Sequence, residues 1–133
     1  MKITSSAIAI LQQLRIVVLQ LDDTDIQLRL EVFSGSSVGQ HTRHILEFYI
    51  CLLTQISKEV ICYDNRERDT KLEQKKEYIL SKIEGIMKDL ATQTKDSTLT
   101  LHSELCKETH LTPSSLSREI LYTIEHTVHH MAI

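Results

Sequence analysis

Tryptophan is absent from this chain of 133 residues, and it has only three glycines, one proline and 5% aromatic side chains. Sheet-rich folds normally need more turn residues than this, so the shortage of glycine and proline favours long helices. With so few aromatic rings, aliphatic side chains must fill the core. One core serves a chain of this length, and we therefore expect a single domain spanning residues 1–133.

An excess of basic charge is also lacking. The formal net charge is -3 and the pI is about 6.1, whereas a nucleic-acid surface needs a basic patch. The basic clusters, such as Lys75-Lys76, are interleaved with glutamates, which is typical of a solvated helix face. We expect no nucleic-acid partner.

The three cysteines, Cys51, Cys62 and Cys106, are an odd number without CxxC spacing. This pattern argues against a disulfide scaffold or a thiolate zinc site and favours a reducing compartment. The N-terminus has no signal-peptide pattern, and no uninterrupted apolar run approaches the ~20 residues that span a bilayer. The sequence therefore predicts a cytoplasmic protein without a membrane partner.

Apolar residues recur at helical spacing in four segments, which predict helices over 4–22, 37–58, 70–92 and from Thr112 to the last residue. Thr112 and Pro113 are typical of a helix start, a capping hydroxyl followed by proline at the first helical position. No Gly, Asn or Pro ends the fourth helix, so we expect that the natural chain can continue beyond Ile133.

In two other segments apolar residues occur at every second position instead. Residues 98–101 (TLTL) predict a small β-hairpin between 97 and 111, whereas residues 26–33 fit an extended segment as well as a helical one and stay unassigned. The expected fold class is all-α, a four-helix bundle with a short β-hairpin between its third and fourth long helices.

Five of the seven histidines fall in two short clusters, one on the second expected helix and one on the fourth. His126 and His130 are four residues apart, so they lie about 40° apart on the helix and can reach one metal ion. A third nitrogen would come from the other cluster, leaving positions for water or substrate. His129 points to the outer face and is the weaker, alternative ligand.

On the second helix, His41 falls inside the apolar arc and His44 at its edge, so geometry slightly favours His41. An HxxxH pair alone is more often ordinary helix surface than a metal site. No HExxH motif supplies the built-in base of a metallopeptidase. Glu119 lies one heptad before His126 and could orient a ligand imidazole or bind the metal weakly.

Two segments carry a resemblance to a known family. Residues 36–46 (SSVGQHTRHIL) are similar to the start of the second helix in DinB-like (DinB/YfiT) proteins, and residues 118–130 (REILYTIEHTVHH) are similar to their HxxxH-bearing fourth helix. The resemblance implies a four-helix bundle of DinB/YfiT type, often dimeric. It also implies the metal ligands His44, His126 and His130, with His44 in place of His41.

The same resemblance implies a divalent metal, zinc or nickel, and a small-molecule substrate. Family members include thiol-dependent S-transferases and isomerases as well as hydrolase-like proteins, so a low-molecular-weight thiol is an expected cofactor. The alternative is a non-catalytic bundle, a homodimer or sensor, with or without metal.

Overall fold

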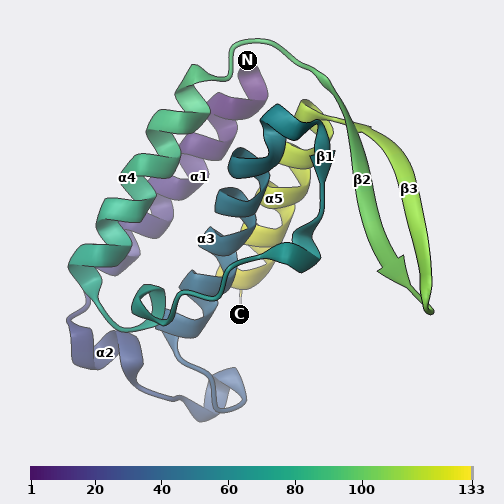
Figure 1. The fold of residues 1–133 in the computed structure, drawn as a ribbon. Coiled ribbons are helices and arrows are strands. Elements are labelled where there is room, and N and C mark those ends of the chain that lie inside the picture. Colours follow the sequence, from purple (N-terminus) through teal and green to yellow (C-terminus); the bar gives the residue numbers. More distant parts are fainter. Residues whose placement is uncertain (133) are drawn as a thin grey trace.

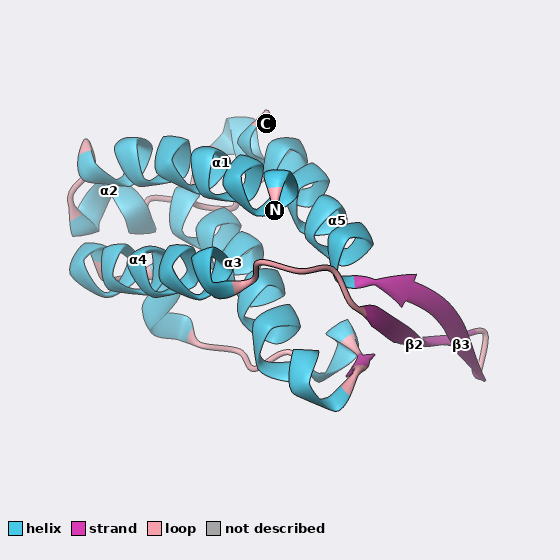
Figure 2. Cartoon of the chain, turned by 90° about the horizontal axis from the view of Figure 1, so that it is seen from above, coloured by secondary structure: helices cyan, strands magenta, loops and turns pink. Residues whose placement is uncertain are grey.

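The computed structural model describes residues 1–132 and contains four long helices. They are α1 (Lys2–Leu19), α3 (Val38–Gln55), α4 (Lys76–Thr92) and α5 (Leu116–Met131). α1 and α3 each pack against both α4 and α5, so the four helices enclose a common interior (Figures 1 and 2). Each helix turns an aliphatic stripe inward; that of α1 contains Ala7, Leu11, Leu14 and Val18.

The prediction of an all-α fold is wrong, because a three-stranded mixed sheet accompanies five α-helices. Its strands are β1 (Val60–Ile61), β2 (Thr98–Leu105) and β3 (Glu108–Ser115), in the order β1-β2-β3. β1 runs parallel to β2, and β3 runs antiparallel to it. A strand of two residues has no periodicity to read, and β1 exists only because the fold brings it beside β2.

The hairpin itself is longer than the sequence indicated, and α5 begins at Leu116 rather than at Thr112. Pro113 pairs with Thr100 inside β3. The N–H of Thr100 donates to the carbonyl of Glu59 on the opposite side, 2.8 Å away, so the nitrogen of Pro113 faces the free edge of the sheet, where no donor is needed. Ser115 is the actual N-cap, and its hydroxyl accepts a hydrogen bond from the N–H of Arg118.

The segment left unassigned, 26–33, is neither a strand nor a long helix. The short helix α2 (Asp23–Gln27) begins with a capping box between Asp22 and Asp25. After it, Leu30 pairs with Ser36 in an isolated bridge around a tight turn. Gly35 lies in this turn with a φ of 86°, a conformation that glycine adopts without strain. The turn delivers the chain directly into α3.

The connection from α3 to α4 consists of β1 and three short 3-10 turns, at Ile56–Lys58, Tyr63–Asn65 and Thr70–Glu73. The last turn packs closely on the first turn of α3, where a Cβ atom at Gly39 would collide with the backbone of Glu73. This close approach holds the connection along the outside of α3 (Figure 1).

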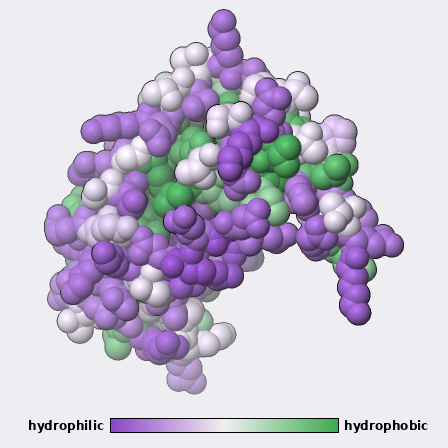
Figure 3. All heavy atoms as spheres, in the orientation of Figure 1, coloured by the Kyte–Doolittle hydropathy of each residue, from purple (hydrophilic) through white to green (hydrophobic). Residues whose placement is uncertain are grey.

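Helix α1 is long and apolar enough, by length and composition alone, to cross a membrane. Core helices meet the same criterion, and the inward stripe of α1 packs into the cluster of buried aliphatic side chains shared by all four long helices. Hydrophilic residues cover most of the face seen in Figure 3, and hydrophobic residues show between them in small groups. The chain thus folds as a globular domain with an aliphatic core.

Candidate metal centre

Three histidines meet where the first turns of α3 lie beside the last turns of α5. His44 comes from α3 and His126 and His130 from α5, and one nitrogen from each lies within 4.8 Å of the other two. The ring centroids are 4.6 to 4.8 Å apart. Two nitrogens bound to a tetrahedral zinc ion are about 3.3 Å apart, given Zn–N bonds of about 2.0 Å, so small side-chain rotations bring this three-histidine group to bonding distance.

Local sequence signals place these side chains. Ser37 begins α3 with a capping box, in which its hydroxyl accepts from the N–H of Gln40 and the Gln40 side chain accepts from the N–H of Ser37. The cap sets the helix start, which puts His44 in the second turn. On α5 the four-residue spacing stacks His126 and His130 one turn apart. Because the end of α5 lies beside the start of α3, the three rings converge.

His126 has a buried nitrogen without a hydrogen-bond partner among the residues that the structure describes. This nitrogen, Nε2, is inaccessible to solvent. The Phe48 ring packs on the same imidazole at a centroid distance of 4.2 Å, and Tyr122 stacks near it at 6.0 Å. Buried polar atoms are normally paired, so such an atom calls for a specific explanation, of which an ion is one.

Burial is the main cause of a low pKa at all three imidazoles. Burial first, and the charge of a neighbouring histidine second, lower the pKa of His44, His126 and His130 from 6.5 to about 4. The positive charge of Arg66 adds to this effect at His44 and His126. All three rings are therefore neutral at neutral pH, the form in which a histidine nitrogen can bind a metal.

The donor set suits a transition metal ion. Imidazole nitrogen is a good ligand for zinc, nickel, copper and iron. The group contains no carboxylate or thiolate, and three protein ligands leave a fourth position open on zinc, as in catalytic rather than structural zinc sites. The residues present thus fit the divalent ion expected from the sequence.

His41, which helical geometry slightly favoured as the third ligand, lies beside this group. Its Nδ1 is 2.9 Å from Nδ1 of His130, and its Nε2 is 3.0 Å from the hydroxyl of Ser36. The sequence did not reveal this contact, and the only signal was the position of His41 within the apolar arc of α3. His129 is exposed and outside the group.

Glu119 does not serve the histidines, contrary to the role considered from its place on the helix. Its carboxylate is buried and accepts hydrogen bonds from the hydroxyls of Tyr63 (2.8 Å) and Ser114 (2.6 Å). Glu119 therefore ties α5 to β3 and to the connection after β1. The negative charge of this carboxylate also raises the pKa of the Tyr63 hydroxyl, second to burial.

A hollow of about 260 Å³ gives solvent access to the group, and Ser36, Gln40, His41, Arg43, His44 and His130 line it. Arg43 is held at its rim by Glu73 (3.0 Å) and, more loosely, by buried Glu47 (3.8 Å). The charges of Arg66, Arg43 and Arg68 all lower the pKa of His44, although the carboxylates of Glu73 and Glu47 balance that of Arg43.

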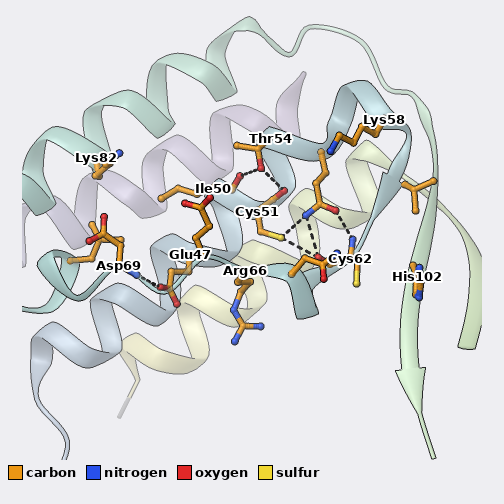
Figure 4. Close-up of a pocket in the computed structure, with 15 residues that line it drawn as sticks. Glu47, Ile50, Cys51, Thr54, Lys58, Cys62, Arg66, Asp69, Lys82 and His102 are labelled. Atoms are coloured by element: carbon orange, nitrogen blue, oxygen red, sulfur yellow. Dashed lines mark hydrogen bonds between the residues drawn. The ribbon is translucent and has the colours of Figure 1, made fainter. Parts of the chain in front are cut away.

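A larger cavity, about 660 Å³, lies elsewhere, between α3 and the connection that follows it. Cys51 and Cys62 line it (Figure 4). Burial raises the pKa of the Cys51 thiol to about 11, so it is protonated at neutral pH and a poor nucleophile. The Cys51 thiol donates to the carbonyl of Cys62, and Gln55 binds both cysteines. This arrangement indicates a structural role.

Arg66 links the cavity to the histidines. Its guanidinium stacks on the Phe48 ring, 4.4 Å from the centroid, and donates to the carbonyl of Tyr63 at 3.0 Å. Phe48 in turn contacts His44 and His126. One side of the group is therefore closed by aromatic rings, and the hollow lined by Arg43 is the open side.

Comparison with known proteins gives no relative: no family model, no curated protein and no solved structure matches the chain.

Proposed function

We propose that the chain binds one divalent metal ion through His44, His126 and His130 and uses it in a thiol-dependent transfer to a small-molecule substrate. The observation that carries the proposal is the buried Nε2 of His126, which has no hydrogen-bond partner within residues 1–132 and belongs to a group with one nitrogen from each ring within 4.8 Å of the others. Membership of the DinB-like family, which the two sequence segments suggest, is part of the same proposal.

A zinc or nickel ion held there would supply Lewis acidity and lower the pKa of a thiol or water in its open position. The chain's own residues supply the rest. The three neutral imidazoles hold the position, and Phe48 and Tyr122 exclude water from the side of His126. The positive charges of Arg66 and Arg68 favour a thiolate or an anionic substrate near His44.

Thiol transfer is favoured over hydrolysis by the absence of a free carboxylate in the group. Amide hydrolysis needs a base for the water and an acid for the leaving amine. Of the buried carboxylates, Glu119 accepts hydrogen bonds from Tyr63 and Ser114. Glu47 accepts from the N–H of Asp69 through one oxygen and lies 3.8 Å from Arg43 through the other, and neither carboxylate belongs to the three-histidine group. A thiol ionises far more readily than water and needs less help.

A metal-binding protein without catalysis is the second candidate. The hollow of about 260 Å³ that leads to the histidines opens broadly to solvent, whereas substrate sites usually enclose most of their ligand. This candidate predicts the same metal affinity but no turnover of any thiol acceptor.

The test is a zinc and nickel titration of the metal-free protein, with metal analysis of the loaded form. We expect one ion per chain. Replacement of His44, His126 or His130 by alanine should weaken binding by more than about 100-fold, since loss of mere supporting partners costs 10–100-fold. Unchanged binding in His126→Ala and His130→Ala would show that the site is misassigned.

Two further variants complete the design. His110→Ala, on the exposed part of β3, is the matched control and should bind as the unaltered chain does. His129→Ala tests the remaining alternative ligand and should also leave binding intact. Loaded protein is then assayed for transfer of small thiols to electrophilic acceptors and for amide hydrolysis, and light scattering tests the expected homodimer.

A further inference from the structure

Three hydrogen bonds connect His130 to the turn before α3. The Ser36 hydroxyl lies 2.7 Å from the carbonyl oxygen of Phe33 and 3.0 Å from Nε2 of His41, and Nδ1 of His41 lies 2.9 Å from Nδ1 of His130. We infer that this chain of bonds makes His41 a positioning residue, which holds His130 as the tautomer whose Nε2 is free to bind metal. The inference rests on the proposed function only in its last step, the binding of the ion.

The direction of the bonds follows from counting protons. A serine hydroxyl has one proton, and Ser36 donates it to the carbonyl of Phe33, which can only accept. The oxygen of Ser36 must therefore accept from Nε2 of His41. A neutral imidazole protonated at Nε2 has a bare Nδ1, so His41 presents an acceptor to its other neighbour.

Two nitrogens 2.9 Å apart need one proton between them. Since Nδ1 of His41 is bare in the neutral ring, the proton belongs to Nδ1 of His130. Nε2 of His130 is then unprotonated and carries a lone pair. Metal-binding histidines usually donate their second N–H to a carboxylate, carbonyl or water, which fixes both tautomer and ring orientation. Here a second histidine takes that role.

The far end of the chain of bonds is held rigidly. Ser36 accepts from the N–H of Leu30 through its own carbonyl (3.0 Å), and Gly35 donates to the carbonyl of Leu30 (3.0 Å). The His41 ring also packs edge-on against Phe33, at a centroid distance of 5.4 Å. The hydrogen bonds of the Leu30–Ser36 turn thereby help to fix the position of His41, and through it that of His130 on α5.

The first experiment needs no metal. In protein labelled with ¹⁵N at histidine, long-range proton–nitrogen spectra report which ring nitrogen carries the proton. We expect His130 of the unaltered chain to be protonated at Nδ1, and His41→Leu to shift it toward the Nε2-protonated form that free imidazole side chains prefer. An Nε2-protonated His130 in the unaltered, metal-free chain would overturn the inference.

The second experiment measures zinc affinity in variants that separate structure from positioning. His41→Leu should weaken zinc binding 10–100-fold. His41→Asn, whose amide oxygen can replace Nδ1 as the acceptor, should recover most of that loss. Ser36→Ala should weaken binding by less than His41→Leu, and His110→Ala should not. Equal zinc affinity in His41→Leu and the unaltered chain would refute the positioning role.

The two proposals fail in distinguishable ways. Failure of the unaltered chain to bind zinc, with His130 still protonated at Nδ1, would contradict the metal site and leave the hydrogen-bonded chain standing. Zinc binding that is unaffected by His41→Leu would contradict the inference and leave the metal site standing. A melting temperature measured without zinc for each variant excludes misfolding as the cause of a lost affinity.

Discussion

Two polar clusters lie at different heights along α3, and they differ in how fully their buried atoms are hydrogen-bonded. In the cysteine cluster (Cys51, Gln55 and Cys62), the Gln55 amide donates to the thiol of Cys51 and accepts from the N–H of Cys62 at 2.8 Å. In the three-histidine group, Nε2 of His126 is buried without a partner among the described residues. A saturated cluster stabilises a fold, whereas an unsaturated one has capacity left for a ligand.

Thermal stabilisation by zinc is the largest effect that tests this difference between the two clusters. A ligand that binds only the folded state at 100 times its Kd raises the free energy of unfolding by about 2.7 kcal/mol. We expect zinc to raise the melting temperature of the unaltered chain by several degrees and to leave His126→Ala unchanged, as scanning calorimetry can measure. Equal stabilisation of both proteins would place the ion elsewhere.

The reciprocal change is Gln55→Ala in the cysteine cluster. It leaves the N–H of buried Cys62 unpaired, which costs about 1–3 kcal/mol, whereas the Cys62 carbonyl still accepts from the Cys51 thiol. Urea unfolding should show this loss of stability, while the zinc affinity stays as it was. If the fully folded Gln55→Ala variant bound zinc tenfold or more weakly than the unaltered chain, the two clusters would not be independent.

A smaller expected effect is the dependence of stability on pH, which the three-histidine group should contribute. The pKa values of His44, His126 and His130 are about 4 in the folded chain, against 6.5 when exposed. Between these values the unfolded chain binds protons that the folded chain does not, so the free energy of unfolding of the metal-free protein should fall from pH 6.5 toward pH 4. Above pH 6.5 these groups contribute no pH dependence.

Urea unfolding at pH 7, 6 and 5 measures this slope, and His126→Leu provides the matched comparison, because it removes one of the three titrating rings and should make the slope shallower. A variant with the same slope as the unaltered chain would mean that His126 is not a buried neutral imidazole. Zinc affinity should also hold to lower pH than at exposed histidines, since the ligands stay neutral to about pH 4.

Parts of this structure were readable from the sequence because their signals are local. The stripe at Ala7, Leu11, Leu14 and Val18 indicates α1 without knowledge of what covers it, and the alternation at 98–101 indicates β2. The HxxxH spacing likewise places His126 and His130 on one face of α5. These predictions needed only the 3.6-residue and two-residue periods of regular structure.

Other parts were misread or missed because they depend on partners distant in the chain. Pro113 was expected to open a helix, yet it lies in β3, where its nitrogen faces the free edge left by the pairing of Thr100. β1 has two residues and no pattern of its own. The choice between His41 and His44 depends on how α3 is rotated against α5, which a helical wheel of α3 alone does not contain.

The amino-acid sequence by itself determined four amphipathic helices and put two histidines a turn apart, because both follow from the geometry of a single helix. Tertiary structure decided that a sheet joins the bundle, that His44 meets that pair, and that His41 contacts His130 instead of joining the group. Each of these outcomes requires surfaces from separate segments to pack together, and packing is settled by the whole core rather than by any one segment.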